Sequence, residues 1–188
     1  MRQPPGFNHR PPLDSASLEE LALAYVARFA VTEAKLRAYL ARKLRERGWT
    51  EDEPGEPPVP DLAARFAAKG YVDDEAWARA RSGSLLRRGY GERRVAEALG
   101  AAGIASALRE QFRPGEAQAR QAGLALARKR GFGPFGIEPP DRPRRERQIA
   151  AMLRAGHSLD TARILVNAAS VTAAEDWAAA ADGDEPCD

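Results

Sequence analysis

The sequence has few of the residues that most enzymes use for chemistry. Its 188 residues include one cysteine, Cys187, and two histidines, His9 and His157. A single cysteine excludes an internal disulfide, which fits a protein of a reducing compartment. Metal- and phosphate-binding patterns such as H-x-x-x-H, C-x-x-C and G-x-x-x-x-G-K-[ST] are absent. We therefore expect no catalytic centre, no metal and no cofactor.

Long apolar stretches are missing as well. No apolar run reaches the roughly 20 residues that a membrane-spanning helix needs. The opening MRQPPGFNHRPP lacks the apolar core of a signal peptide. We expect a cytoplasmic protein whose residues 1–16 form a disordered, proline-rich lead.

Aromatic residues make up only 7% of the chain, although hydrophobic residues reach 44%. Alanine fills many of the apolar positions, whereas the β-branched and aromatic residues that favour strands are sparse. A core rich in alanine suits helices that pack at close range. This composition predicts an all-α fold.

Charge is unevenly distributed, although the net charge is only +2. Between Glu75 and Arg147, basic residues outnumber acidic residues about two to one, and from Thr172 to the end there are acids and no bases. A basic middle favours a polyanion or an acidic protein surface as partner. Because arginine greatly outnumbers lysine, codon bias in a GC-rich genome is an equal explanation. The acidic tail could shield the basic body, or be passive.

A glycine followed by an aromatic residue recurs along the chain. The pairs are Gly48-Trp49, Gly70-Tyr71, Gly89-Tyr90 and Gly131-Phe132, with related pairs at Gly103-Ile104 and Gly156-His157. Glycine at the C′ position ends a helix, and the next residue commonly packs back on the last turn. The pairs therefore predict repeated short helices, each closed by a hydrophobic contact.

Apolar spacing predicts nine helices between these pairs. The expected N-caps are Ser15 or Ser17, Thr32, Asp73 or Asp74, and Ser158. The spacing of Leu40, Leu44, Gly48 and Trp49 recurs in Val95, Leu99, Gly103 and Ile104, which predicts a repeat array. We divide the chain into the lead (1–16), repeat 1 (17–72) with an acidic, Pro-rich connector (50–61), repeat 2 (73–112), repeat 3 (113–170) with a Gly/Pro loop (131–143), and an acidic tail (171–188).

Three stretches resemble the RecX family of regulatory proteins. They are LALAYVARFAVTEAKLRAYLARK, DLAARFAAKGYVDDEAWARAR and RRGYGERRVAEALGAAGI. The second and third carry the family's helix-ending glycines, paired acids and G-x-G turn. The matching residues are Gly70, Tyr71, Asp73, Asp74, Trp77, Gly89, Gly91 and Gly103, and the earlier pair Gly48-Trp49 fits the same pattern. The resemblance covers roughly residues 18–168.

This resemblance implies a binding protein rather than an enzyme. RecX-like proteins are tandem arrays of three-helix repeats that form an elongated, curved body. They bind the RecA recombinase and its filament on single-stranded DNA, and they restrain its ATPase, strand-exchange and coprotease activities. The chain would accordingly modulate DNA repair, recombination and the SOS response as a monomer, with direct, sequence-independent contact with DNA.

The basic G-x-G turn is the candidate contact surface. Arg93 and Arg94 stand at the start of a helix, where the dipole disfavours cations, so we expect something outside that helix to select them. Gly89 and Gly91 should bring the arginines on both sides onto one edge, with Tyr90 between them for stacking. The candidate partner- or DNA-binding residues are Arg79, Arg81, Arg87, Arg88, Tyr90, Arg93 and Arg94. The alternative is a helix-turn-helix transcriptional regulator with Gly91–Gly103 as its recognition helix.

Overall fold

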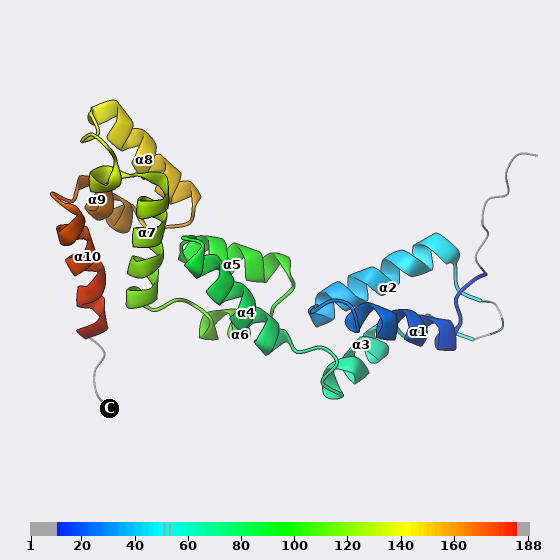
Figure 1. Cartoon of the computed structure of the whole chain (residues 1–188). Coiled ribbons are helices and arrows are strands. Elements are labelled where there is room, and N and C mark those ends of the chain that lie inside the picture. Colours follow the sequence, from blue (N-terminus) through cyan, green and yellow to red (C-terminus); the bar gives the residue numbers. More distant parts are fainter. Residues whose placement is uncertain (1–10, 51, 53, 184–188) are drawn as a thin grey trace, which may run out of the picture. The chain divides into compact units, whose positions relative to one another are not determined.

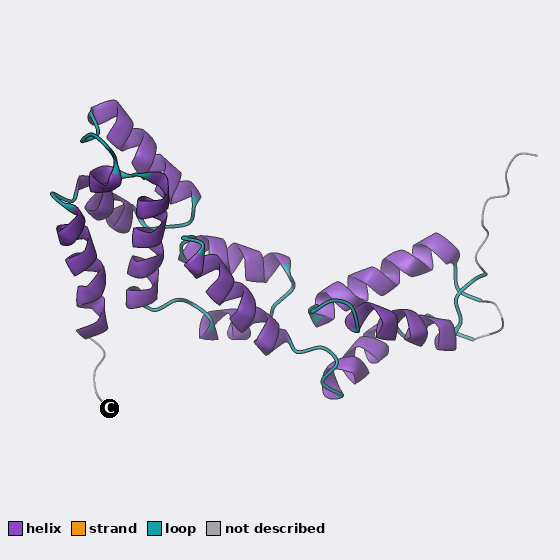
Figure 2. Cartoon of the chain, viewed as in Figure 1, coloured by secondary structure: helices purple, strands orange, loops and turns teal. Residues whose placement is uncertain are grey.

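The protein is described by a computed structural model of residues 11–50, 52 and 54–183. These residues form helices joined by short turns, and they contain no β-strand, which confirms the all-α fold class (Figures 1 and 2). The α-helices are α1 (Ser15–Val26), α2 (Glu33–Arg47), α3 (Val59–Ala68), α4 (Asp74–Arg87), α5 (Glu92–Ala101), α6 (Ser106–Gln111), α7 (Glu116–Arg130), α8 (Arg142–Arg154), α9 (Leu159–Asn167) and α10 (Val171–Ala179), and the short 3-10 helices are η1 (Gly133–Phe135) and η2 (Ala180–Gly183). None of the helices in this part of the chain is long and apolar enough to cross a membrane.

The chain divides into two compact units. The first holds the described residues up to Trp77 together with Ala102–Ile104, and the second holds Ala78–Ala101 and the described residues from Ala105 onward. The division does not follow the repeat boundaries expected from the sequence, because the first turn of α4 belongs to the first unit. The grouping into three repeats stays a prediction.

The core of the first unit is built from α1, α2 and α3. Leu18 and Ala22 of α1 pack with Leu36 and Leu40 of α2, and Phe66 of α3 completes the cluster; all five are fully buried. The four-residue spacing within α1 and α2 puts each pair on one helical face, as the apolar pattern predicts.

In the second unit, α7, α8, α9 and α10 share a core. Leu124 of α7, Met152 of α8 and Leu165 of α9 are almost fully buried in one cluster with Ala174 and Ala178 of α10. The helix α10 lies alongside α7 (Figure 1). The sequence did not predict α10, because its residues 171–179 were assigned to the acidic tail.

The predicted helix endings are confirmed. All six glycines of the recurring pairs have positive φ, between 62° and 96°. Four of the following residues donate the backbone hydrogen bond of a Schellman ending to the carbonyl five residues earlier, for example Tyr71 N to Phe66 O at 3.0 Å. The other three donors are Tyr90, Phe132 and His157. The aromatic contact is visible at Tyr71, whose ring meets Phe66 edge-on at 5.4 Å.

Several N-caps are as predicted and one is not. Thr32 accepts a hydrogen bond from Lys35 N, and Ser158 accepts one from Thr161 N. At α1 the cap is Asp14, neither Ser15 nor Ser17: the Asp14 carboxylate accepts from Ser17 N while the Ser17 hydroxyl accepts from Asp14 N. This reciprocal capping box satisfies two backbone donors at the start of α1.

The lead expected to be disordered through residue 16 is ordered in its last part. Leu13 is fully buried, and its backbone pairs with the end of α2 through Leu13 N to Gly48 O and Thr50 N to Leu13 O, both 2.9 Å. Trp49 takes part in this bridge with Leu13, so the chain after α2 pairs with the lead and does not form a Schellman turn. Residues 1–10 of the expected lead lie outside the described residues, as do Glu51 and Glu53 of the acidic connector and residues 184–188 of the tail.

The remaining features concern the end of α1 and the buried face of α4. Phe29 lies beyond α1 with 57% of its surface exposed. In α4 the buried residues are Ala78, Ser82 and Leu85. The ring of Trp77 lies 4.4 Å from Nζ of Lys35 of α2, within the first unit.

Candidate partner-binding surface

The seven predicted contact residues all lie in the second unit, along α4, the turn after it and the start of α5. The six arginines are exposed and Tyr90 is half-buried. Arg79 lies 5.9 Å from the ring of Phe112 at the far end of α4 from the turn. Arg81 and Arg87 are exposed on the same helix. Exposure suits a contact role.

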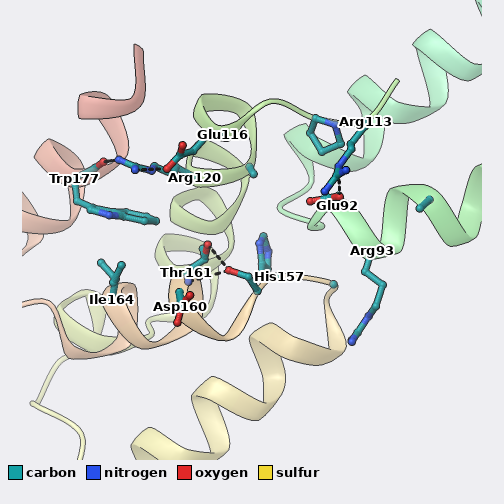
Figure 3. Close-up of a pocket in the computed structure, with 15 residues that line it drawn as sticks. Glu92, Arg93, Arg113, Glu116, Arg120, His157, Asp160, Thr161, Ile164 and Trp177 are labelled. Atoms are coloured by element: carbon teal, nitrogen blue, oxygen red, sulfur yellow. Dashed lines mark hydrogen bonds and ion pairs between the residues drawn. The ribbon is translucent and has the colours of Figure 1, made fainter. Parts of the chain in front are cut away.

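Arg93 has a partner inside the protein. Its guanidinium donates a hydrogen bond to Leu153 O in the last turn of α8, and its backbone N–H donates to Gly156 O at 3.2 Å. Figure 3 shows the Arg93 side chain directed toward the end of α8. The exposed carbonyls at a helix C-terminus carry partial negative charge and favour a cation. These carbonyls lie outside the helix of Arg93 and favour a cation there, so a bound partner is not needed to explain why arginine stands at this position.

The contacts of Arg94 and Arg88 differ from those of Arg93 and from each other. Arg94 is paired with Glu97 one turn along α5, at 3.2 Å. Arg88 lies over the ring of Tyr90, 5.4 Å from its centroid, and lines a hollow that includes neither Arg93 nor Arg94. The guanidiniums of Arg88, Arg93 and Arg94 therefore have three different surroundings.

The two glycines of the G-x-G turn permit close packing on both sides. A Cβ on Gly89 would stand 2.9 Å from Leu126 N of α7, and a Cβ on Gly91 would stand 2.4 Å from the Gly156 carbonyl carbon. Gly91 N donates to Ala155 O at 2.9 Å. The turn is thus wedged between α7 and the α8–α9 turn, and Tyr90 is held at that junction.

The hollow beside Tyr90, which we call the Tyr90 hollow, has a volume of about 300 Å³. Its lining consists of Arg88, Tyr90, Leu126, Lys129, Arg130, Phe132, Ala151, Arg154 and Ala155. Sequence reasoning missed Lys129, Arg130, Phe132 and Arg154. Their only signal was the Gly131-Phe132 pair and the basic last turns of two predicted helices, which gave no indication that these turns meet.

Three of the residues that match the RecX pattern, Asp73, Asp74 and Gly103, lie at a second junction, within the first unit. Asp73 caps α4 by accepting from Ala76 N at 2.8 Å, whereas Asp74 accepts from Glu33 N at the start of α2, also at 2.8 Å. Thr32 donates its hydroxyl to Ala102 O at 2.6 Å in a buried hydrogen bond. A Cβ on Gly103 would stand 2.2 Å from that of Ala34. The paired acids and the closing glycine therefore join elements far apart in the sequence.

A larger hollow of about 850 Å³ lies between α5, α7, α9 and α10 (Figure 3). Four of its charged groups form two ion pairs: Arg113 with Glu92 at 2.6 Å, and Arg120 with Glu116. His157 is buried at its edge, and Gly89 O accepts a hydrogen bond from His157 Nε2 at 3.0 Å. Burial lowers the pKa of His157, and the hydrogen bond to Gly89 opposes this shift. Among the residues that the structure describes, no three histidine, cysteine or acidic side chains gather as metal ligands would.

Comparison with known sequences gives a consistent result. The chain is 32% identical to the regulatory protein RecX of Myxococcus xanthus over 80% of its own length and 84% of that protein. It is 36% identical to the regulatory protein RecX of Thermus thermophilus over 58% of its length and 71% of that protein. No protein-family model matches the chain.

Solved structures agree with this likeness at the level of the fold. A crystal structure of RecX from Lactobacillus salivarius superposes with a TM-score of 0.63 at 16% identity, covering 81% of this chain and 94% of that one. A second RecX crystal structure superposes with a TM-score of 0.60 at 17% identity, covering 80% of this chain and 70% of that one. The sequence relationship to the Myxococcus protein, joined to the shared all-α fold, establishes that this chain belongs to the RecX family of regulatory proteins.

Proposed function

We propose that this protein binds RecA and its filament on single-stranded DNA in the cytoplasm, acts there as a monomer, and inhibits ATP hydrolysis, strand exchange and coprotease activity. Membership of the RecX family is the observation that carries the proposal. The mode of action is binding, without chemistry of its own. Inhibition requires only that the bound protein resist the conformational cycle of the filament.

The exposed arginines of α4 support contact with such a partner. Arg81 and Arg87 are exposed, and neither has an ion pair within the described residues. A cation that does not stabilise its own fold is available to neutralise a phosphate or a carboxylate of the partner. We assign Arg81, Arg87 and Arg88 to this contact before Arg93 and Arg94, whose charges have partners within the chain.

The structure argues against the alternative of a helix-turn-helix regulator. A recognition helix presents its N-terminal residues to base edges in the major groove. In α5 the N-terminal residues Gly91 and Arg93 are hydrogen-bonded to the end of α8. The backbone at that end of α5 is held against the end of α8, which disfavours its insertion into a groove.

The test is RecA ATP hydrolysis on circular single-stranded DNA with increasing amounts of this protein. We expect hydrolysis and strand exchange to slow at substoichiometric amounts. In a second arm, the Arg81→Glu/Arg87→Glu variant should bind the filament more weakly. The matched control is Arg144→Glu/Arg145→Glu, which makes the same charge change at two exposed positions of α8. Unchanged rates at equimolar protein would rule out the proposed function, and equal weakening by both variants would rule out α4 as the contact.

A further inference from the structure

We propose that the Tyr90 hollow binds a segment of single-stranded nucleic acid directly, with its four cations on backbone phosphates and its two rings against a base. The proposal rests on the proposed function, because it names the component of the RecA–DNA filament that this hollow touches. It is nevertheless a statement about this protein alone, and it can be tested in the absence of RecA.

The first argument is the charge of the hollow. Arg88, Lys129, Arg130 and Arg154 line it, and no acidic residue of the described chain does. None of the four has an ion pair within the described residues. Other arginines of the same unit are neutralised: Arg113 by Glu92, Arg120 by Glu116 and Arg128 by Glu175. Like charges that converge without counter-charges repel one another, and a bound polyanion relieves this repulsion.

Helix dipoles account for each cation separately but not for their convergence. Lys129 and Arg130 are in the last turn of α7, and Arg154 is in the last turn of α8, where cations are favoured. That preference would be met equally if the side chains pointed away from one another. Here they line one hollow with Arg88, which follows α4. The helix dipoles stabilise a cation at each helix end, and the packing of the helices brings these cations to one hollow.

The second argument is that the aromatic wall is held in place. Gly89 packs on the backbone of α7 and Gly91 on the α8–α9 turn, at distances that exclude a Cβ on either glycine. Tyr90 N also donates to Leu85 O at 3.1 Å, and Phe132 N donates to Ala127 O at 2.9 Å. Both rings therefore project from hydrogen-bonded turns, so little conformational freedom is lost when a ligand binds.

The combination of rings and cations selects single strands. Base faces are hidden inside the stack of a duplex, whereas an unpaired base can stack on an aromatic ring or an arginine. The hollow's volume of about 300 Å³ suits one nucleotide, not the width of a duplex. An acidic peptide would satisfy the cations but would offer no base to stack on the two rings.

The experiment measures binding of a labelled oligothymidine to the full chain, without RecA, across a series of salt concentrations. The test variant is Arg88→Gln/Arg154→Gln, and Lys129→Gln/Arg130→Gln is a second, independent variant of the same hollow. Arg144→Gln/Arg145→Gln removes the same charge from exposed positions of α8 outside the hollow. Circular dichroism checks that every variant keeps its helices.

We expect each hollow variant to flatten the log–log salt dependence by about 1.4, since each lost phosphate contact on a single strand removes about 0.7 from the slope. Tyr90→Leu should weaken binding at least about fivefold while leaving the salt slope unchanged, because a stacking contact carries no charge. The same Tyr90 variant should bind duplex DNA as the parent does. The control pair should keep both slope and affinity closer to the parent.

Three results would overturn the proposal: hollow variants no weaker than the control pair, a Tyr90→Leu variant that loses single-strand and duplex binding equally, or tighter binding of polyglutamate than of oligothymidine at equal length. A chain that inhibits RecA but binds no oligothymidine would refute the hollow and leave the proposed function standing. A chain that binds oligothymidine but leaves RecA unaffected would refute the proposed function and leave the Tyr90 hollow as a nucleic-acid site.

Discussion

His157 connects two turns of the second unit through a single buried ring. Its Nε2 is hydrogen-bonded to Gly89 O, and its backbone N–H donates to Met152 O at the end of α8. Because a carbonyl oxygen can only accept, Nε2 carries the proton. A neutral imidazole fills this position without a buried charge, so the junction depends on the protonation state of one residue.

This predicts a pH dependence of stability below about pH 6.5, the ordinary pKa of histidine. Burial lowers the pKa of His157 in the folded protein, so the unfolded chain takes up its proton first as the pH falls. The free energy of unfolding should therefore decrease by up to about 1.4 kcal/mol per pH unit on account of this group, from about pH 6.5 down to its folded pKa. Above pH 6.5 its contribution should be constant.

The check is urea denaturation of the parent and of His157→Gln between pH 5 and pH 8. Glutamine keeps an N–H for Gly89 O but does not titrate, and every other titrating group, including His9, is common to both proteins. The variant should show a shallower loss of stability on acidification. Parallel curves for the two proteins would contradict the prediction.

Single residues also show where sequence reasoning works and where it stops. Thr32 and Ser158 were predicted as caps because a cap acts on amides two or three residues away, which the sequence displays. The role of Asp74 was hidden, because its partner Glu33 N is 41 residues earlier in the chain. The same holds for Arg93: the unfavourable dipole of its own helix can be read from the sequence, but the α8 carbonyl that accepts its hydrogen bond cannot.

At the scale of elements, α10 is the helix that the sequence analysis left out. Its acidic residues led to its assignment to the acidic tail. However, Ser170 caps it, and Ala174, Trp177 and Ala178 have helical spacing. Ala174 and Ala178 are fully buried, and Arg120 of α7 donates to Trp177 O at 2.9 Å. The helix is an integral part of the core of the second unit, so residues 171–179 do not behave as a solvated tail.

Removal of α10 should accordingly destabilise the protein. A chain ending at Ala168 loses the burial of two alanines and the contact of Trp177 with the core, so its free energy of unfolding should fall by about 3 kcal/mol or more, the order of an aromatic truncation. A chain ending at Gly183 keeps α10 and should unfold with the parent. Thermal denaturation followed by circular dichroism distinguishes them; equal midpoints for the shorter chain and the parent would show that α10 adds no stability.

At the scale of the whole molecule, the charge of the last five residues is opposite to that of the middle of the chain: the end is acidic and the middle is basic. Asp184, Glu185 and Asp188 are the three acids that follow the described residues. If they compete with nucleic acid for the exposed arginines, their removal should tighten binding to single-stranded DNA at low salt, and the gain should vanish near 1 M salt, where charges are screened within about 3 Å.

Deletion of residues 184–188 tests this without disturbing α10, whereas a truncation after Val171, which charge alone suggests, would unfold part of the core. The control replaces the three acids with glutamine and keeps the length. Both changes should raise the affinity for oligothymidine equally. An affinity equal to that of the parent in either case would indicate a passive tail.

The fold class could be predicted from the sequence because it depends on local signals: apolar spacing, glycine endings and caps. The division into units could not, because the pairing of Thr32 with Ala102 or of Gly91 with Gly156 is decided by packing across long sequence distances. The Tyr90 hollow, like the division into units, depends on packing between segments that are far apart in the sequence. Of its four cations only Arg88 was predicted, since Lys129, Arg130 and Arg154 come from segments that meet Arg88 only in the folded unit.

The buried hydrogen bond from Thr32 to Ala102 has a consequence for the order in which a nascent chain can fold. Residues 13–77 are synthesised before Ala102–Ile104, yet those three residues belong to the same unit. Until they emerge, the Thr32 hydroxyl lacks its acceptor and Ala34 lacks the cover of Gly103. The amino-terminal unit is thus completed late, by a segment that is synthesised after the start of its neighbour.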